Sequence, residues 1–424
     1  MGAKREGAVS GEVTSWLAKN AVPLSGLVAG VPSDDLQPLK DVLSGVRVVG
    51  LGEATHGTRE FFQLKHRLLE FLVTELGFSV LAMEASASAA PAVDAYVRHG
   101  VGEAETALSG LGFWTWRTYE VLAVIEWMRA YNRGRPEAEK VRFVGIDPQR
   151  CGASIAVLDT FLSERAPDRV VGLRAALGVL AHAYPGQHPD PQRRLVHDAE
   201  DLAAFVHDQF PEAPEAVRHA RILVRAADLV TRSRLHDDAQ QTVYAARDRY
   251  MADAVHKLLT VPSAKIVLWA HNGHIAKNPY DNGPLPLGHH LREWHQDAYY
   301  ALGLLFGRGS FRACRGRPGA RARRPVDNRI GMAGSTTVEG HLAAAGRGDL
   351  VIDLRSVDTA PSTVKQWLHG RSATRSFGAY VPHWTYRLHR SPTVVAQEYD
   401  GLAYVAASTS SRPLPPAAAS PRHR

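Results

Sequence analysis

The sequence predicts an α/β fold with a mostly parallel central sheet flanked by helices and with a large helical insertion. Short apolar runs rich in β-branched residues recur along the chain, as expected for strands buried on both faces. Stretches with helical spacing of apolar residues separate these runs, which is typical of crossover connections between parallel strands. No fixed-period repeat is visible, and this argues against a solenoid or a propeller.

The first expected strand covers residues 46–51 (VRVVGL), a continuous apolar run. Helical spacing follows over residues 60–76, and Gly77 is the stop signal. The other expected strands are residues 78–83, 141–146, 265–270, 299–306, 350–354 and 402–407. Helices are expected at residues 89–99, in the segment that ends at Tyr131, and at residues 154–165.

The chain has 424 residues, of which 45% are hydrophobic and 22% charged, ordinary values for a globular protein. We expect a helical lead-in over residues 1–40 and an α/β domain over residues 41–412. A stretch inside that domain, residues 166–260, is nearly all helix-forming and is predicted to be a helical insertion. Residues 413–424 are predicted to be a disordered tail.

The formal net charge of +7 could suggest nucleic acid, but much of the excess is arginine in one segment, residues 307–329. That segment is rich in Gly, Ala and Pro and lacks the interleaved aromatic residues of single-strand binders. We therefore interpret it as a solvated loop and expect no nucleic-acid partner. No apolar run approaches the length of a membrane span, so no membrane partner is expected either.

Cysteine usage favours a cytoplasmic protein. The two cysteines, Cys151 and Cys314, lie far apart without a CxxC pattern and cannot form a disulfide framework. The first residues also lack the apolar segment of a secretory signal peptide.

Ionisable residues follow the first four strands. Because the carboxyl ends of parallel strands meet at one edge of a sheet, these side chains should gather in the crevice where ligands bind. This prediction of a site rests on topology and not on any single motif. The residues are Glu53 and His56, Glu84, Asp147, and His271 with His274.

His56 is the best candidate for a general base, since an imidazole titrates near neutral pH. Either Glu53 or Glu84 could fix its tautomer and raise its basicity. A water molecule activated in this way would hydrolyse an ester or lactone without a covalent acyl-enzyme. The later histidine pair could stabilise the oxyanion or protonate the leaving alkoxide. No G-x-S-x-G elbow is present, which argues against an ordinary α/β-hydrolase triad.

Structural interpretations compete with these roles. Glu84 could form an ion pair with Arg59 or Lys65, and Asp147 could set a turn before a proline. The histidines at 271 and 274 could instead cap the next helix, and the tryptophans at 114 and 116 could be core residues or the wall of an apolar pocket. A zinc site is the chemical alternative, but the chain lacks H-E-x-x-H, so a site without metal or cofactor is favoured.

Several blocks of the chain resemble the erythromycin esterase family, in the same order and from about Leu39 to Arg412. Each block is short, but the combination is highly specific. The blocks are residues 52–62 (GEATHGTREFF) with Lys65, 78–84 (FSVLAME), 112–116 (GFWTW), 143–149 (FVGIDPQ), 247–248 (RD) with Met251, and 269–274 (WAHNGH).

The resemblance implies a mixed α/β fold with a helical insertion over the cleft, and hydrolysis of macrolide lactones by water activated at a histidine. It assigns catalytic roles to His56, Glu53, Glu84 and His271. Some members have arginine where this chain has lysine at position 65, so the charge is kept and a bidentate contact is lost. Residues expected to bind substrate are Arg59, Lys65, Trp114, Trp116, Asp147 and His274.

The expected partner is a small-molecule lactone or ester, of macrolide or related polyketide type, and antibiotic resistance is one implied role. Two other functions stay open at this point. The same site could serve natural-product biosynthesis as an acyltransferase or cyclase, or the chain could bind a metabolite without turning it over. The intact set of acid and base residues argues against the second of these.

Overall fold

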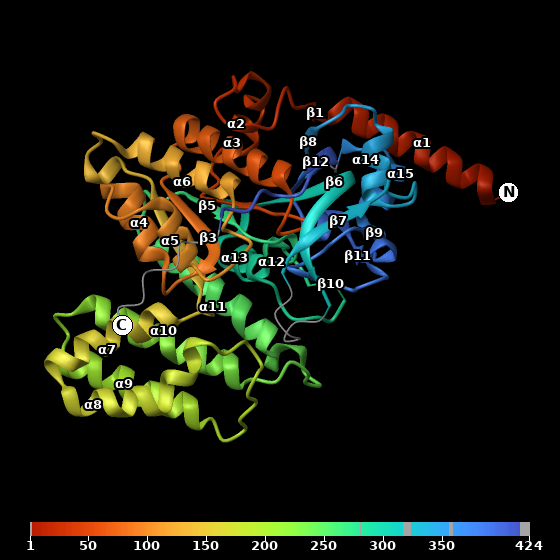
Figure 1. Cartoon of the computed structure of the whole chain (residues 1–424). Coiled ribbons are helices and arrows are strands. Elements are labelled where there is room, and N and C mark those ends of the chain that lie inside the picture. Colours follow the sequence, from red (N-terminus) through yellow and green to blue (C-terminus); the bar gives the residue numbers. More distant parts are fainter. Residues whose placement is uncertain (1, 280, 317–323, 356–358, 416–424) are drawn as a thin grey trace.

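The apolar runs form the middle of one sheet in a computed structural model, which describes residues 2–279, 281–316, 324–355 and 359–415 (Figure 1). Within these residues the strands follow the order β1-β8-β12-β6-β2-β5-β3-β4, and β7 and β10 also pair with β6. The strands are β1 (Val22–Pro23), β2 (Val48–Leu51), β3 (Val80–Ser86), β4 (Arg142–Asp147), β5 (Ile266–Trp269), β6 (Tyr299–Arg315), β7 (Val326–Ile330), β8 (Leu350–Asp353), β10 (Tyr380–Val381) and β12 (Gly401–Ser408).

The six strands from β12 to β4 are parallel to one another, whereas β1 pairs with β8, β8 with β12 and β7 with β6 in antiparallel fashion. Every residue of β2, β3 and β5 is buried, which is why their sequences read as continuous apolar runs. The predicted α/β fold with a mostly parallel sheet is confirmed. A smaller sheet pairs β9 (Ser372–Thr374) with β11 (Ser391–Thr393).

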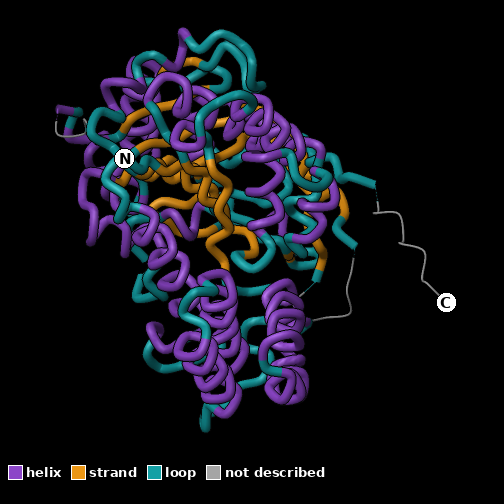
Figure 2. Tube along the Cα trace, turned by 90° about the vertical axis from the view of Figure 1, so that its left-hand side faces the viewer, coloured by secondary structure: helices purple, strands orange, loops and turns teal. Residues whose placement is uncertain are grey.

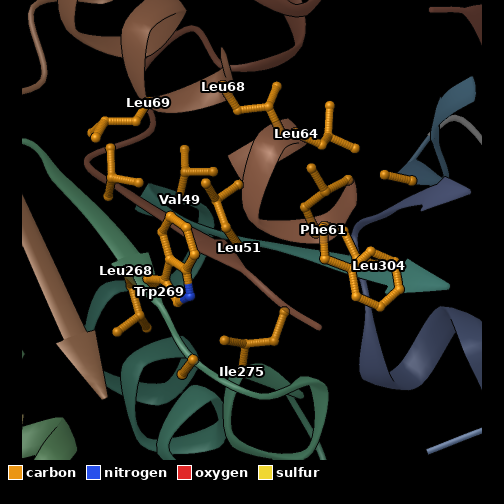
Figure 3. Close-up of a cluster of buried hydrophobic side chains, with 14 of the residues drawn as sticks. Val49, Leu51, Phe61, Leu64, Leu68, Leu69, Leu268, Trp269, Ile275 and Leu304 are labelled. Atoms are coloured by element: carbon orange, nitrogen blue, oxygen red, sulfur yellow. The ribbon is translucent and has the colours of Figure 1, made fainter. Parts of the chain in front are cut away.

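Helix α3 (Arg59–Leu76) covers the middle of one sheet face, as its spacing predicts. Figure 3 shows its Phe61 and Leu64 gathered with Val49 and Leu51 of β2 and with residues of β5. The helix ends at Gly77, whose positive φ of 70° is easily adopted only without a side chain.

Further helices flank the sheet, and β1 adds a short strand to the predicted helical lead-in. They are α1 (Gly2–Asn20), α2 (Leu39–Val42), α4 (Ala90–His99), α5 (Ala104–Gly110), α6 (Tyr119–Asn132), α12 (Asn272–Ile275), α13 (Leu287–His295), α14 (Val338–Ala344), α15 (Ser362–His369) and α16 (Val395–Glu398).

The segment predicted as an insertion is helical in the structure. It contains α8 (Pro167–Gly172), α9 (Arg194–Gln209), α10 (Pro214–Thr231) and α11 (Val243–Leu258). These helices and α7 (Gly152–Arg165) lie together below the sheet (Figures 1 and 2). Helices α7 to α10 share a second hydrophobic core that includes Leu158, Val206 and Leu223. The predicted domain boundaries, residues 41–412 including the insertion at 166–260, stay a prediction.

The solvated loop predicted for residues 307–329 is wrong for the residues that the structure describes. Strand β6 continues to Arg315 and pairs with β7 in an antiparallel hairpin. Phe311 and Ala313 are buried on one face of it, while arginines occupy positions between and around them. The arginine content hid this alternation, which is the ordinary pattern of a strand with one buried face. Residues 317–323, in the same predicted loop, lie outside the described residues.

The predicted disordered tail is wrong at its first residues. The Leu414 N–H donates to the Arg117 carbonyl at 3.0 Å, and the Leu414 side chain is buried. Residues 416–424 of that prediction lie outside the described residues. Both cysteines are buried and neither forms a disulfide. Among the described residues no helix is long and apolar enough to cross a membrane.

Replacing Phe311 tests the hairpin. Its ring is fully buried and stacks on Phe377 at 4.7 Å between centroids. Phe311→Ala should lower the free energy of unfolding by about 3–5 kcal/mol, measured by urea denaturation. Val326→Ala, an apolar truncation on the exposed side of the same hairpin, should change it by less than about 0.5 kcal/mol. Equally small effects at both positions would favour the solvated loop.

Candidate functional site

The ionisable side chains that follow four strands meet at one edge of the sheet, as the topology predicts. We call Glu53, His56, Glu84, Asp147, His271 and His274 the strand-end cluster. The backbone N–H of His271 donates to Glu84 Oε2 at 3.0 Å, and the rings of His56 and His271 lie 5.0 Å apart. Strands β2, β5, β3 and β4 are consecutive neighbours, which brings these residues together.

The turn between β2 and α3 is fixed by its own side chains and by β6. Thr55 Oγ1 lies 2.7 Å from Thr58 Oγ1 and accepts the Gly57 N–H. The Gly57 carbonyl accepts from Arg312 at 2.9 Å, and a Cβ at Gly57 would overlap the Arg312 backbone. Glycine is therefore required for this close approach, and the turn holds Glu53 and His56 in place.

Glu53 connects His56 to a buried lysine. Its Oε1 lies 2.8 Å from His56 Nδ1, and its Oε2 accepts from Lys65 Nζ at 2.7 Å. Burial lowers the pKa of Lys65 to about 8 although Glu53 opposes the shift, so the lysine stays charged at neutral pH. A carboxylate beside Nδ1 fixes the proton there and leaves the lone pair on Nε2. In the described part of the chain no hydrogen bond reaches His56 Nε2.

Glu84 is held as a carboxylate by cationic neighbours. Burial alone would raise its pKa, but His274 and Arg247 hold it well below the usual value. Arg247 Nη2 donates to Glu84 Oε1 at 2.7 Å. The structural ion pair expected at Glu84 therefore exists, but with neither expected partner. The side chain of Arg59 lies 3.8 Å from Glu120 instead, away from the cluster.

Helix α11 supplies two side chains to which sequence reasoning gave no role, Arg247 and Asp248. Arg247 also bonds Asp147 Oδ2 at 2.7 Å, and so spans the ends of β3 and β4. Asp248 Oδ1 lies 2.7 Å from His274 Nδ1. The pair stands in a helical stretch. Arg247 lies 163 residues from Glu84 and 100 from Asp147, Asp248 lies 26 residues from His274, and only the family resemblance marked the pair.

His274 carries a positive charge. Burial disfavours the charged ring, but Asp248 and Glu84 raise its pKa to about 10, against the opposing effect of Arg247. Arg247 Nη1 lies 2.9 Å from His274 Nε2, a distance that would suit a neutral, accepting ring. We favour the charged ring because two carboxylates face it and Arg247 already shares its charge with Asp147.

His271 is neutral and caps α12, which confirms the capping interpretation for this residue. Its Nδ1 accepts the Gly273 N–H at 3.1 Å, so the ring proton is on Nε2, 3.2 Å from the Phe377 carbonyl. Burial, with the nearby His56 and His274, lowers its pKa to about 3. His274 is no cap and pairs with carboxylates instead.

The two tryptophans differ: the core interpretation holds for Trp116 and the pocket-wall interpretation holds for Trp114. Trp116 is a buried core residue whose Nε1–H donates to the Glu84 carbonyl, and its ring lies 5.7 Å edge-on from His56. Trp114 lines a cavity. Asp147 likewise serves twice, since its Oδ1 accepts the Gln149 N–H in the expected turn while Oδ2 binds Arg247.

A cavity of about 270 Å³ adjoins the cluster. Two of its lining residues connect it to the strand-end cluster: Arg247, and Thr115, which precedes Trp116 in the sequence. The helical insertion forms one wall and loops beyond the sheet edge form the other. Its lining residues are Gly112, Phe113, Trp114, Thr115, Gln149, Arg150, Tyr184, Pro185, Arg234, Val243, Tyr244, Arg247, Ala379 and Tyr380.

Among the described residues, no group of three or more His, Cys, Asp or Glu side chains is arranged to hold a metal ion. The carboxylates of the cluster face the cationic or N–H groups described above. The expectation of a site without metal or cofactor stays a prediction.

The chain belongs to the erythromycin esterase family, whose model matches residues 73–408. The turn that carries Glu53 and His56 precedes the matched residues. The family defines the protein as a hydrolase, which agrees with the acid and base groups at the sheet edge.

Among individual proteins, erythromycin esterase type II of Escherichia coli is 28% identical over 306 residues, 64% of this chain and 71% of its own. A putative hydrolase of Bacillus subtilis (strain 168), YbfO, is 22% identical over 92% of this chain and 90% of its own.

Solved structures share the fold. A crystal structure of a succinoglycan biosynthesis protein matches with a TM-score of 0.78 at 23% identity, over 96% of this chain and 99% of that one. A mutant of the erythromycin esterase EreC in its open conformation matches with a TM-score of 0.67 at 19% identity, over 89% of this chain and 95% of its own. At these identities the two structures bear on the fold alone.

Removing Arg247 should leave the buried Asp147 carboxylate without its cation and Glu84 with only His274 as a cationic neighbour in contact. Arg247→Ala is expected to lower the free energy of unfolding by about 3–5 kcal/mol at neutral pH, measured by urea denaturation. Because the folded-state pKa of Glu84 is depressed, its stabilising contribution is present above its ordinary pKa of 4.5 and is lost as the pH falls through the folded value. The difference between wild type and variant should therefore shrink in acid.

The control is Arg174→Ala, which removes an exposed arginine paired with Asp159. It should unfold like the wild type. A difference between wild type and Arg247→Ala that grows as the pH falls would contradict the assignment of the buried charges.

Proposed function

We propose that the protein hydrolyses a carboxylic ester or macrolactone, of macrolide or related polyketide type, with a water molecule activated at His56. One observation carries the proposal. Glu53 engages Nδ1 of His56 at 2.8 Å, and no hydrogen bond of the described residues occupies Nε2. A histidine oriented in this way by a carboxylate is an effective general base.

In the first step, His56 Nε2 takes a proton from water as the water oxygen attacks the ester carbonyl. Glu53 stabilises the imidazolium that forms, and Lys65 holds Glu53 in place. In the second step, the tetrahedral intermediate expels the alkoxide, which receives the proton from His56. The products are a carboxylic acid and an alcohol, or one hydroxy acid from a lactone.

His271 is the proposed donor to the oxyanion. Its ring is adjacent to that of His56, and its low pKa keeps it neutral with a proton on Nε2. That N–H now meets the Phe377 carbonyl at a long 3.2 Å, so a developing oxyanion could compete for it. In this proposal Glu84 acts as a positioning residue, because it binds the His271 backbone N–H.

The substrate would enter through the cavity beside Arg247 and rest against Trp114. Lys65 is fully buried against Glu53, so we propose that it supports the base and does not contact substrate. The names of the Escherichia coli relatives support a macrolide, and ring opening would then give antibiotic resistance. Two buried cysteines that form no disulfide are consistent with the proposed cytoplasmic location.

Removing the base should abolish hydrolysis. His56→Ala and Glu53→Gln are each expected to lower kcat/KM by about 10²–10⁴-fold, since one loses the base and the other its orientation. His99→Ala, a histidine exposed on the surface, is the control and should match the wild type. The measurement incubates the purified chain with a panel of macrolides and polyketide lactones and follows product mass.

Hydrolysis adds one water to the substrate mass. Cyclisation or acyl transfer would not, and such a product would replace the hydrolysis proposal with a biosynthetic one. Undiminished ring opening by the His56 variant would refute the role of the base.

The charge at position 65 is testable by itself. Lys65→Met should lower kcat/KM about tenfold, the value of one charge-assisted hydrogen bond of roughly 1.5 kcal/mol, and Lys65→Arg should retain most activity. Equal activity of both variants would show that the charge has no role.

A further inference from the structure

The outer part of the cavity is cationic. Of the residues that the structure describes, three arginines line it, Arg150, Arg234 and Arg247, and no carboxylate side chain does. Arg247 is already paired with Glu84 and Asp147 behind the cavity wall. Within the described residues, neither of the other two guanidinium groups forms an ion pair, and this distinguishes them from the balanced charges of the strand-end cluster.

Arg150 is held between aromatic rings. Its guanidinium carbon lies 4.5 Å from the ring centroid of Tyr184 and 5.8 Å from that of Phe113. Stacking on ring faces orients the planar guanidinium and leaves its N–H groups free to donate sideways. No hydrogen bond from this side chain is made to the described residues, so these donors remain for a ligand.

Arg234 is fixed from the opposite wall. Its Nε and Nη2 both donate to the Pro185 carbonyl, at 3.1 and 2.9 Å. It lies over Gly186, where a Cβ would come within 2.6 Å of Arg234 Cγ. A neutral carbonyl does not compensate the charge of the guanidinium, and one terminal nitrogen, Nη1, makes no bond to the described residues.

We propose that the substrate is an ester that carries a carboxylate on an otherwise apolar body, and that Arg150 and Arg234 bind this carboxylate. The ester in this inference rests on the proposed function, but the recognition of a carboxylate depends only on the residues that line the cavity. Aromatic walls from Phe113, Trp114 and Tyr244 suit an apolar body. Two uncompensated guanidinium groups beside them attract an oxyanion through charge-assisted hydrogen bonds and repel a cation.

Equilibrium binding tests this without turnover. Calorimetry with the full chain would compare phenylbutyrate, neutral phenylbutanamide and phenylbutylammonium, which share one apolar body. The carboxylate should bind about tenfold more tightly than the amide, as expected for a charge-assisted contact, and the ammonium most weakly. In the double variant Arg150→Met, Arg234→Met the preference for carboxylate over amide should fall below about threefold.

The matched control is Arg135→Met, since Arg135 also stacks on a ring, that of Tyr131, but lies outside the cavity. It should keep the wild-type preference, and thermal melting checks that each variant is folded. Equal affinity of the wild type for all three ligands, or an unchanged preference in a folded double variant, would overturn the inference.

The two proposals fail separately. A chain that prefers the carboxylate but hydrolyses no ester would refute the proposed hydrolysis and leave the binding inference standing. A chain that opens lactones and shows no charge preference would refute only the binding inference.

Discussion

The guanidinium of Arg247 binds two carboxylates from neighbouring strands, Glu84 of β3 and Asp147 of β4. Parallel strands deliver these groups to one edge of the sheet, where each would be costly to bury without a cation. The arginine comes from α11, so the same contact attaches the helical segment to the sheet. Glu84 also accepts the backbone N–H of His271. The conformation of the chain that follows β5 therefore depends on this ion pair as well.

A second buried ion pair joins Lys65 to Glu53. The carboxylates of both groups face cations, while His271 is neutral and His56 has one nitrogen to which no described residue forms a hydrogen bond. This arrangement matters chemically. Charges that are already paired do not compete for the proton of an attacking water, and a neutral ring N–H can donate to an oxyanion.

The buried middle of the sheet could be predicted because strands covered on both faces must be apolar throughout. The meeting of Glu53, Glu84, Asp147 and His271 followed from that topology alone. Arg247 could not be found in this way, since its partners lie far away in sequence and a helical arginine usually faces solvent. The hairpin of β6 and β7 was missed because half-buried arginines, Arg312 and Arg315, stand between and beside its buried Phe311 and Ala313. The ion-pair partner of each predicted side chain also depends on local pairing. Arg59 lies beside Glu120, and Lys65 binds Glu53.

The account depends on the tautomer of His56, because only a ring with its proton on Nδ1 can accept a proton from water at Nε2. The direct measurement is ¹⁵N NMR of the histidine side chains, with the His56 signals assigned by their absence in His56→Ala. A protonated Nδ1 and an unprotonated Nε2 at neutral pH are the predicted result. A proton on Nε2 with a bare Nδ1 would contradict the hydrogen bond to Glu53 and, with it, the proposed base.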